Sequence, residues 1–143
     1  MTHLDEAKDL SEYFSREYRN PKLEPFEISE LYDLFPNESG NTESKNKWNN
    51  PWPNNLRAGV YLILSADLEV IYIGKSGNTF GDRLKDYFKY DADRNCRLEH
   101  IWNTDPKYVV TVAVPDSSKF ESSALEGYLL SKIKTSDNIQ EVS

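Results

Sequence analysis

Two short apolar stretches separated by a polar break mark the middle of the chain. Residues 59–65 and 70–76 are rich in β-branched and aromatic side chains, and the break between them, 66–69, is short and polar. This pattern predicts a β-hairpin. A third run of the same kind, 108–114, ends before Pro115 and predicts a third strand.

The spacing of apolar residues predicts helices on both sides of these strands. We expect them over residues 5–18, 28–35, 79–90 and 120–134. Thr79 is the expected N-cap of the third helix, with Asp82 three residues after it. Residues 37–55 contain seven asparagines, which predicts a long loop, and Trp48 and Trp52 within it are expected to pack across the core.

From residue 59 onward, the order strand, strand, helix, strand, helix is typical of a small α+β domain. We therefore expect a small three-stranded antiparallel sheet flanked by helices, with a helical extension at the N-terminus. The chain is predicted to divide into an acidic extension with its polar loop, residues 1–50, and a domain of residues 51–143.

The charge of the chain narrows the choice of partners. Its net charge is −7, whereas a protein that coats nucleic acid without specificity depends on an excess of Lys and Arg. Residues 1–50 carry 11 acidic and 6 basic side chains, a net of −5, and residues 51–143 carry 13 and 11, a net of −2. We regard the acidic residues 1–50 as a candidate surface for a protein partner or for self-association.

Cysteine content and hydropathy indicate the compartment. Cys96 is the only cysteine, so an intramolecular disulfide is impossible and a cytoplasmic location is expected. The N-terminus lacks the basic and apolar regions of a secretion signal, and no stretch of about 18 apolar residues occurs. We expect no association with a membrane.

The predicted hairpin brings two tyrosines onto one face of the sheet. With a turn about residues 67–68, Tyr61 lies opposite Gly74 and Ile63 lies opposite Tyr72. Tyr61 and Tyr72 are then diagonal neighbours, and Gly74 leaves room in front of Tyr61. Such a pair is either an ordinary aromatic contact of the core or part of a site, and the hairpin alone supports both interpretations equally.

Three further residues suggest chemistry near the hairpin. Arg83 and Tyr87 are four residues apart, so a helix would present them on one face, where an arginine can bind a phosphate. Taken alone, Arg83 is more often a solvated charge. Glu126 falls beside Leu129 and Ile133 in the apolar stripe of the last helix. A carboxylate there must be paired, bound to a metal or placed at the mouth of a cleft.

Several common motifs are excluded. Residues 74–76 resemble the end of a nucleotide-binding phosphate loop, but Glu69 stands where that loop needs a glycine. The glycine spacing that follows does not fit a dinucleotide-binding fingerprint. With two histidines in the chain, a histidine-based zinc site is not supported. Glu-x-Lys pairs at residues 6–8 and 43–45 lie outside any apolar strand.

Dispersed positions in order along the chain resemble the GIY-YIG nuclease family. They begin with two triplets, Gly59-Val60-Tyr61 and, after ten intervening residues, Tyr72-Ile73-Gly74. The further matches are Lys75, Arg83, Tyr87, Glu126 and Asn138. The run 70–88 is similar to the N-terminal incision domain of the bacterial excinuclease C subunit, and the resemblance covers residues 57–140.

The departures from the family pattern are mild. Val60 replaces an isoleucine and keeps its β-branched shape. The proline that often precedes the terminal asparagine is absent before Asn138. Asp82 and Asp86 flank Arg83 where relatives tend to be basic, which argues against tight non-specific binding of DNA.

The resemblance implies hydrolysis of a DNA phosphodiester by water, with one Mg²⁺ or Mn²⁺ ion held by Glu126. Tyr61 or Tyr72 would accept the proton of the water. The room left by Gly74 favours Tyr61, although the reverse assignment stays open, and Lys75 would favour the phenolate.

Other residues would bind the substrate or support the site. By the same resemblance, Arg83 neutralises the phosphate, Tyr87 orients it and Asn138 supports the region of Glu126. From the charge pattern we expect Gly74 and a basic patch to contact the DNA. The patch comprises Lys75, Arg83, Lys85, Lys89, Arg94 and Arg97. The alternative function is a binding module that uses the same fold without turnover.

Overall fold

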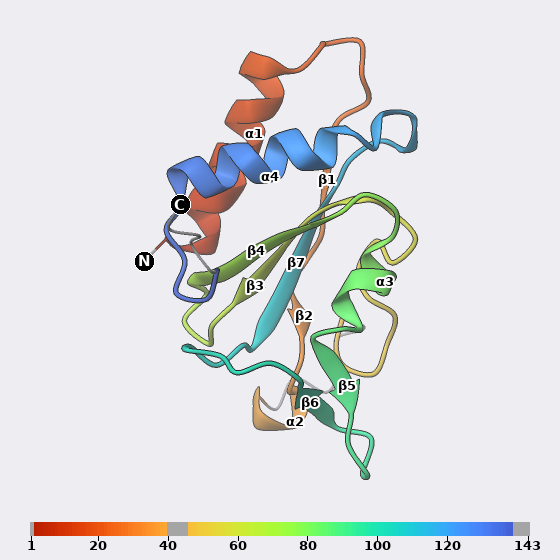
Figure 1. The fold of residues 1–143 in the computed structure, drawn as a ribbon, viewed down its shortest axis with the longest axis vertical. Coiled ribbons are helices and arrows are strands. Elements are labelled where there is room, and N and C mark those ends of the chain that lie inside the picture. Colours follow the sequence, from red (N-terminus) through yellow and green to blue (C-terminus); the bar gives the residue numbers. More distant parts are fainter. Residues whose placement is uncertain (1, 40–45, 139–143) are drawn as a thin grey trace.

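One antiparallel sheet forms the centre of the protein in the computed structural model, which describes residues 2–39 and 46–138 (Figure 1). Its long strands are β3 (Gly59–Leu64), β4 (Val70–Ser76) and β7 (Tyr108–Ala113). Two strands of two residues each, β1 (Glu27–Ile28) and β2 (Tyr32–Asp33), pair with β7. The α+β class and the antiparallel three-stranded sheet are confirmed, and β1 and β2 extend that sheet.

The pairing of β3 with β4 follows the predicted register. Tyr61 is opposite Gly74, and Ile63 is opposite Tyr72. The register shifts between Ile63 and Leu64, so the pairing departs from the prediction only next to the turn. The two tyrosines therefore stand on the same face of the sheet, because side chains alternate along each strand.

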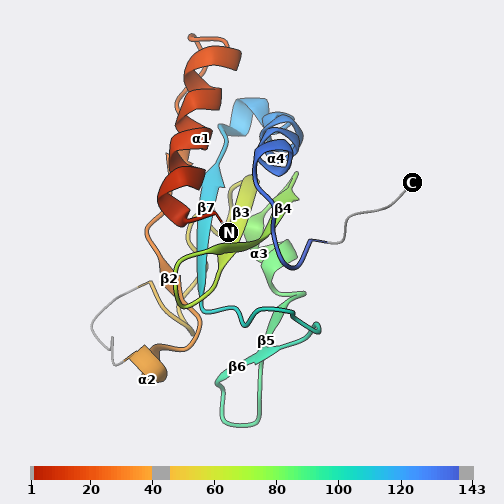
Figure 2. The same cartoon turned by 90° about the vertical axis from the view of Figure 1, so that its left-hand side faces the viewer.

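Two helices, α1 (Leu4–Tyr18) and α4 (Glu121–Lys132), lie side by side over the face that points away from these tyrosines (Figure 2). Leu4, Ala7 and Phe14 recur along one side of α1 and are buried together with Val60 and Leu125. The expected first and last helices are confirmed to within two residues at each end. A single 3₁₀ turn, Asp116–Ser118, precedes α4.

The opposite face of the sheet is covered by α3 (Phe80–Leu84) and by the hairpin of β5 (Phe88–Tyr90) and β6 (Cys96–Leu98). Trp48 and Trp52 pack against this second core, as expected. Thr79 caps α3 by accepting a hydrogen bond from the Asp82 amide at 3.3 Å.

The predicted helix over residues 79–90 is wrong in its second half. Asp91 Oδ1 accepts hydrogen bonds from the amides of Asp93 and Asn95 at 2.8 and 2.9 Å, which closes a tight turn. The aromatic residues before this turn therefore pair with β6 as a strand, which suits their β propensity, and the helix ends at Leu84.

The predicted helix over residues 28–35 is also wrong. Ser29 donates its amide to the Thr111 carbonyl at 2.8 Å, and Leu34 donates its amide to the Lys107 carbonyl at 2.9 Å. These bonds satisfy the otherwise open edge of β7, which a helix would leave unpaired. A short helix, α2 (Pro36–Ser39), follows.

The N-terminal residues share the sheet and the core with the rest of the chain. Arg19 and Glu121 form a buried ion pair between the end of α1 and the start of α4. Lys107 Nζ and Asp33 Oδ1 lie 2.6 Å apart beside β7. The division of the chain at residue 50 stays a prediction. Residues 40–45 of the expected loop and the last five residues of the expected domain lie outside the described residues.

Candidate active site

Three tyrosines meet on one face of the β3–β4 hairpin. Tyr61 Oη donates a hydrogen bond to Tyr87 Oη at 3.0 Å, and the hydroxyls of Tyr72 and Tyr87 lie 3.2 Å apart. The rings of Tyr61 and Tyr72 are nearly parallel, with centroids 6.3 Å apart. Tyr87 comes from the turn between α3 and β5, not from a helix. The structure nevertheless brings it to the two hairpin tyrosines.

Gly74 makes room for the ring of Tyr61. A Cβ atom on Gly74 would lie 2.3 Å from both Cζ and Oη of Tyr61, and Tyr61 is fully buried. We expect this room to admit the attacking water; the Tyr61 ring occupies the part of it next to Gly74, and the role of the room stays a prediction. Tyr72 is half-buried and is the more exposed of the two.

A cavity of about 350 Å³ brings together the hairpin, α3 and α4. It is lined by Tyr61, Tyr72, Gly74, Lys75, Gly77, Arg83 and Glu126. These side chains meet because β4 is the outer strand of the sheet, so elements on either face can reach its edge. Leu125, Leu129 and Ile133 are buried, whereas Glu126 is half-buried. Of the three settings expected for this carboxylate, its place is the mouth of a cleft.

A serine that sequence reasoning missed holds Lys75. Lys75 Nζ donates a hydrogen bond to Ser123 Oγ at 2.7 Å. Ser123 precedes Glu126 by three residues on α4 and therefore lies on the same side of that helix. This spacing is the signal that could have identified it.

Two other neighbours of the tyrosines come from the loop between β6 and β7. The Trp102 ring lies 5.9 Å from that of Tyr72, and the His100 ring lies 5.0 Å from that of Tyr87. The loop follows no regular period, so the sequence contains no signal for their position.

Burial is the main influence on the pKa values of Tyr61, Tyr72 and Glu126. It raises the pKa values of the Tyr61 and Tyr72 hydroxyls well above their ordinary value, and their contacts with Tyr87 add to this, whereas Arg83 opposes it. Burial likewise raises the pKa of Glu126 in spite of Lys75 and Arg83 nearby. The pKa of Arg83 is itself raised, chiefly by its interaction with Tyr61.

Asn138 binds the backbone of β4, and its expected support of the Glu126 region stays a prediction. Its Oδ1 accepts a hydrogen bond from the Ile73 amide at 2.8 Å, and its Nδ2 donates to the Ile73 carbonyl at 2.9 Å. The Asp137 amide donates to the Ile71 carbonyl at 3.0 Å. The segment after α4 thereby pairs with the outer edge of the strand that carries Tyr72 and Gly74.

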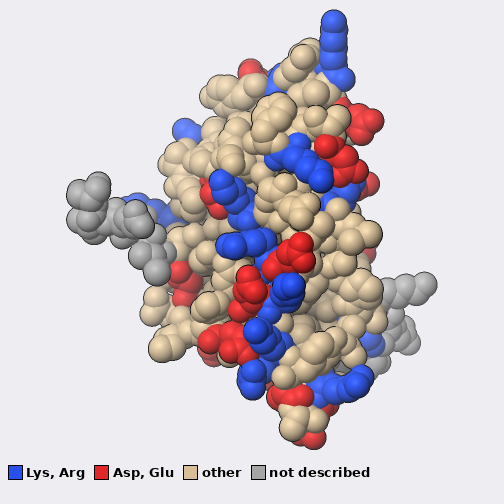
Figure 3. Space-filling model, turned by 45° about the vertical axis from the view of Figure 1, so that its right-hand side comes forward, with Lys and Arg blue, Asp and Glu red and all other residues tan. Residues whose placement is uncertain are grey.

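Of the expected basic patch, Lys75 and Arg83 line the 350 Å³ cavity, and the other four residues lie outside it. Lys85 is 3.7 Å from Asp82, and Arg97 is paired with Glu99. Lys89 faces Arg97 across the β5–β6 pair. Figure 3 shows Lys and Arg interleaved with Asp and Glu over the surface that it presents. Their assignment to substrate binding stays a prediction.

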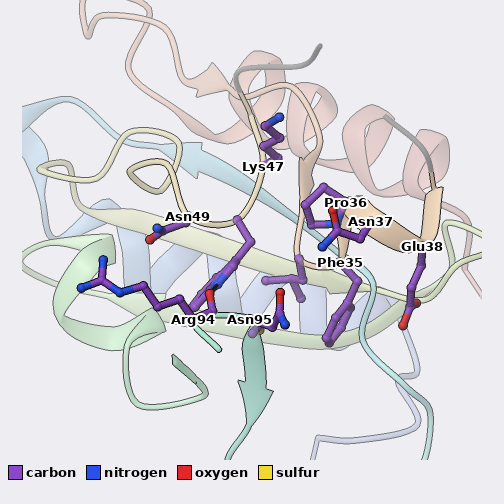
Figure 4. A pocket seen from close by; sticks show the side chains of 11 residues that line it. Phe35, Pro36, Asn37, Glu38, Lys47, Asn49, Arg94 and Asn95 are labelled. Carbon is purple, nitrogen blue, oxygen red and sulfur yellow. Dashed lines mark hydrogen bonds between the residues drawn. The ribbon is translucent and has the colours of Figure 1, made fainter. Parts of the chain in front are cut away.

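A separate pocket is drawn in Figure 4, where Arg94 and Asn95 lie opposite Phe35 and Glu38. It has a volume of about 470 Å³ and shares no residue with the cavity of Glu126. Burial raises the pKa of the Cys96 thiol at this pocket to about 12, which disfavours the thiolate form.

The capacity of the site for a metal rests on one carboxylate. Among the described residues there is no group of three or more His, Cys, Asp or Glu side chains that could hold an ion. Glu126 is a hard oxygen donor at the mouth of a cleft, and this suits a divalent ion that keeps most of its waters or takes oxygens from a substrate.

No helix of the described residues has the length and apolar character to cross a membrane.

The comparison with protein families identifies most of the chain. The model described as the GIY-YIG catalytic domain matches residues 57–139, which is more than half of the sequence. No curated protein matches the chain, and no solved structure does. The matched segment contains β3, β4, β7, α3 and α4, and with them every residue that lines the 350 Å³ cavity. The chain therefore belongs to the GIY-YIG nuclease family.

Proposed function

We propose that the protein is a metal-dependent endonuclease that hydrolyses DNA phosphodiester bonds. The observation that supports this most strongly is that Arg83 and Glu126, distant in sequence, line one cavity with Tyr61 and Tyr72. Phosphodiester hydrolysis needs a cation for the phosphate, a carboxylate for a metal and a group that takes a proton from water. The cavity contains one candidate or more for each task.

Arg83 is the proposed phosphate ligand. Its guanidinium is charged, as that of an arginine always is in proteins. Lys75, which is held by Ser123, places a second positive charge at the same cavity. Tyr87 fixes the hydroxyls of the two hairpin tyrosines and thus their orientation toward a bound phosphate.

Tyr72 is the proposed proton acceptor. An ordinary tyrosine is only ~0.1% ionised at neutral pH, and burial raises the pKa of both candidates further. Tyr72 is the more exposed, and the space beside Gly74 that favoured Tyr61 is filled by the Tyr61 ring. Tyr61 then serves as a hydrogen-bond donor that holds Tyr87 in place. Arg83 opposes the rise in the pKa of Tyr72 and so promotes its ionisation.

Glu126 is the residue that would hold one Mg²⁺ or Mn²⁺ ion. When bound, such an ion supplies positive charge to the scissile phosphate and lowers the pKa of a coordinated water. Burial raises the pKa of Glu126 in spite of Lys75 and Arg83 nearby, so metal binding should weaken at a higher pH than for an ordinary glutamate.

The run 70–88 also suggests an incision activity similar to that of the excinuclease C domain.

A second candidate function is a binding module without turnover. The burial that keeps both tyrosines protonated favours it, because a phenol is a poor base. The joint presence of Arg83 and Glu126 in one cavity favours the nuclease.

Cleavage of plasmid and single-stranded DNA with Mg²⁺ or Mn²⁺ tests the proposal. We expect Arg83→Ala and Glu126→Gln each to lower the rate about 100-fold or more. Arg16→Ala and Glu12→Gln on the exposed side of α1 are the matched controls and should cleave like the wild type. Unchanged cleavage by both site variants would contradict the assigned roles. No cleavage of any DNA by the wild type, with no binding of either metal, would favour the binding module.

A further inference from the structure

A second and larger cavity adjoins the candidate active site. It has a volume of about 850 Å³ and shares Tyr72 and Arg83 with the smaller cavity. Tyr87 also lines it, together with residues 100–102 from the loop between β6 and β7. If a ligand places a phosphate against Arg83, the group attached to that phosphate would therefore lie beside the larger cavity.

The larger cavity is rich in flat and apolar side chains. Trp102 lies 5.9 Å from Tyr72 and is backed by Phe88, whose ring is stacked at 6.1 Å with an angle of 8° between the planes. His100 lies against Tyr87 and is exposed, and Ile101 is fully exposed. Aromatic faces of this kind bind nucleobases by stacking, whatever the base.

The loop that carries these residues is held at both ends. The Glu99 amide donates to the Tyr87 carbonyl at 3.0 Å. At the other end, the Asn103 amide donates to Asp137 Oδ1 at 2.5 Å, and Asn103 Nδ2 donates to the Ser136 carbonyl at 3.0 Å. The position of residues 100–102 is thus largely set before a ligand binds, which reduces the entropy cost of binding.

The charges of the two cavities differ in sign. The smaller is lined by two cations and one carboxylate, a net of +1. The larger is lined by one cation, Arg83, and three carboxylates, of which Glu99 is paired with Arg97, so the net is −1 once Arg97 is counted. A phosphate is favoured in the first and disfavoured in the second. An uncharged ring whose edge carries N–H donors suits the second, since carboxylates accept from such donors.

We propose that the larger cavity binds an unstacked nucleobase of the DNA strand, next to the phosphate that is cleaved, an inference that rests on the proposed nuclease function. A base enters such a cavity only when it has left the duplex stack. The preferred substrate is accordingly single-stranded DNA, or DNA with a splayed or unpaired nucleotide at the cleavage point.

Binding measured without cleavage tests this proposal. The probes are a ten-nucleotide thymidine oligonucleotide and a ten-unit abasic strand with the same phosphates but no bases, both titrated in EDTA and followed by fluorescence anisotropy. We expect the wild type to bind the base-bearing strand at least about fivefold more tightly, the smallest effect expected for one stacked base. The double variant His100→Ala/Ile101→Ala should lose this preference. Both side chains are exposed, so the fold should tolerate the change.

Control variants separate this subsite from general effects. Trp102→Phe keeps an aromatic ring and should keep most of the preference, and Phe120→Ala removes an exposed ring outside both cavities and should change nothing. Equal affinity for the two strands, no binding of either, or a preference that survives in the double variant would overturn the proposal. Because no metal is present, these outcomes are independent of the cleavage assay that tests the nuclease function.

Discussion

Asn138 binds both backbone groups of Ile73, with its Oδ1 2.8 Å from the amide nitrogen and its Nδ2 2.9 Å from the carbonyl oxygen. A side chain thus occupies the place that a further strand would take at the edge of β4. The neighbours of Ile73 on this strand are Tyr72 and Gly74, so the position of the candidate site depends on a residue after the last helix.

We expect Asn138→Ala to lower the free energy of unfolding by about 1–3 kcal/mol, because two backbone groups of β4 lose their partner. The DNA-cleavage rate should fall as well, since Tyr72 and Gly74 move with the strand. Denaturant unfolding and cleavage assays measure the two effects. The matched control is Asn95→Ala at an exposed position, and equal behaviour of the two variants would argue against a supporting role for Asn138.

Gly74→Ala should displace the Tyr61 ring. The new methyl group would lie 2.3 Å from its hydroxyl oxygen, which is far inside van der Waals contact. We expect a loss of stability of about 1–3 kcal/mol and a larger fractional loss of cleavage. Gly127→Ala on α4 is the control, since its Cβ would meet no atom within 4 Å. An alanine there should raise stability slightly through its helix propensity. A fully active Gly74→Ala variant would show that the position of Tyr61 is unimportant.

The cleavage rate should rise with pH across the neutral and alkaline range. The proposed base must be deprotonated, and burial raises the pKa of Tyr72 above its ordinary value, so the phenolate fraction grows about tenfold per pH unit below that pKa. Single-turnover rates between about pH 6 and pH 9 measure this slope. In Tyr72→Phe, the increase in cleavage rate with pH should be abolished. If this increase is lost in Tyr61→Phe and kept in Tyr72→Phe, the base is Tyr61.

On the acid side, metal binding should weaken at a higher pH than for an ordinary glutamate. Burial raises the pKa of Glu126 above its usual 4.5, and protonation removes the proposed ligand. Titration calorimetry with Mn²⁺ at several pH values checks this. The weakening should be absent from Glu126→Gln, which should bind poorly at every pH.

The buried pair of Arg19 and Glu121 should contribute strongly to stability. Burial raises the pKa of Glu121, but hydrogen bonds from Arg19 and Ser118 outweigh this, so its pKa lies below the usual 4.5. A group whose pKa is lowered by folding stabilises the protein above its unfolded pKa and loses that contribution as the pH falls through its folded pKa.

Glu121→Gln should accordingly lower the unfolding free energy by about 3–5 kcal/mol at neutral pH, because Arg19 stays buried without its partner. The loss of stability on acidification below pH 4.5 should be smaller in this variant than in the wild type. Urea unfolding at pH 7 and at lower pH measures both. Glu12→Gln on the exposed side of α1 should change neither.

The features predicted correctly depend on strong local patterns. Alternation along the β3–β4 hairpin specifies which side chains share a face, so the pattern of the chain alone places Tyr61 and Tyr72 together. The sequence also indicates a special role for Glu126, because a carboxylate is rare beside the apolar stripe of a helix. The same helical spacing could have identified Ser123, which binds Lys75, because it lies three residues before Glu126.

The errors arose where distant segments decide the local structure. Residues 28 and 32–33 become strands because β7 has an open edge, a fact that their own sequence does not contain. The helix after Thr79 stops at Leu84 because the following residues pair with β6. The loop residues His100 and Trp102 lie against Tyr87 while Asn103 after them is bound to Asp137, and no periodicity predicts such contacts.

Because α1 and β2 contribute to the core, the segment matched by the family model contains the candidate catalytic residues but not the complete hydrophobic core. The match begins at residue 57, yet Leu4, Phe14 and Tyr32 are buried in the same two cores as the matched strands. A fragment of residues 57–139 would retain all the candidate catalytic groups and still leave both faces of its sheet partly bare. Engineering of this nuclease fold, such as fusion to a DNA-targeting domain, therefore has to keep the residues before 57 that complete these cores, including Leu34, Trp48 and Trp52.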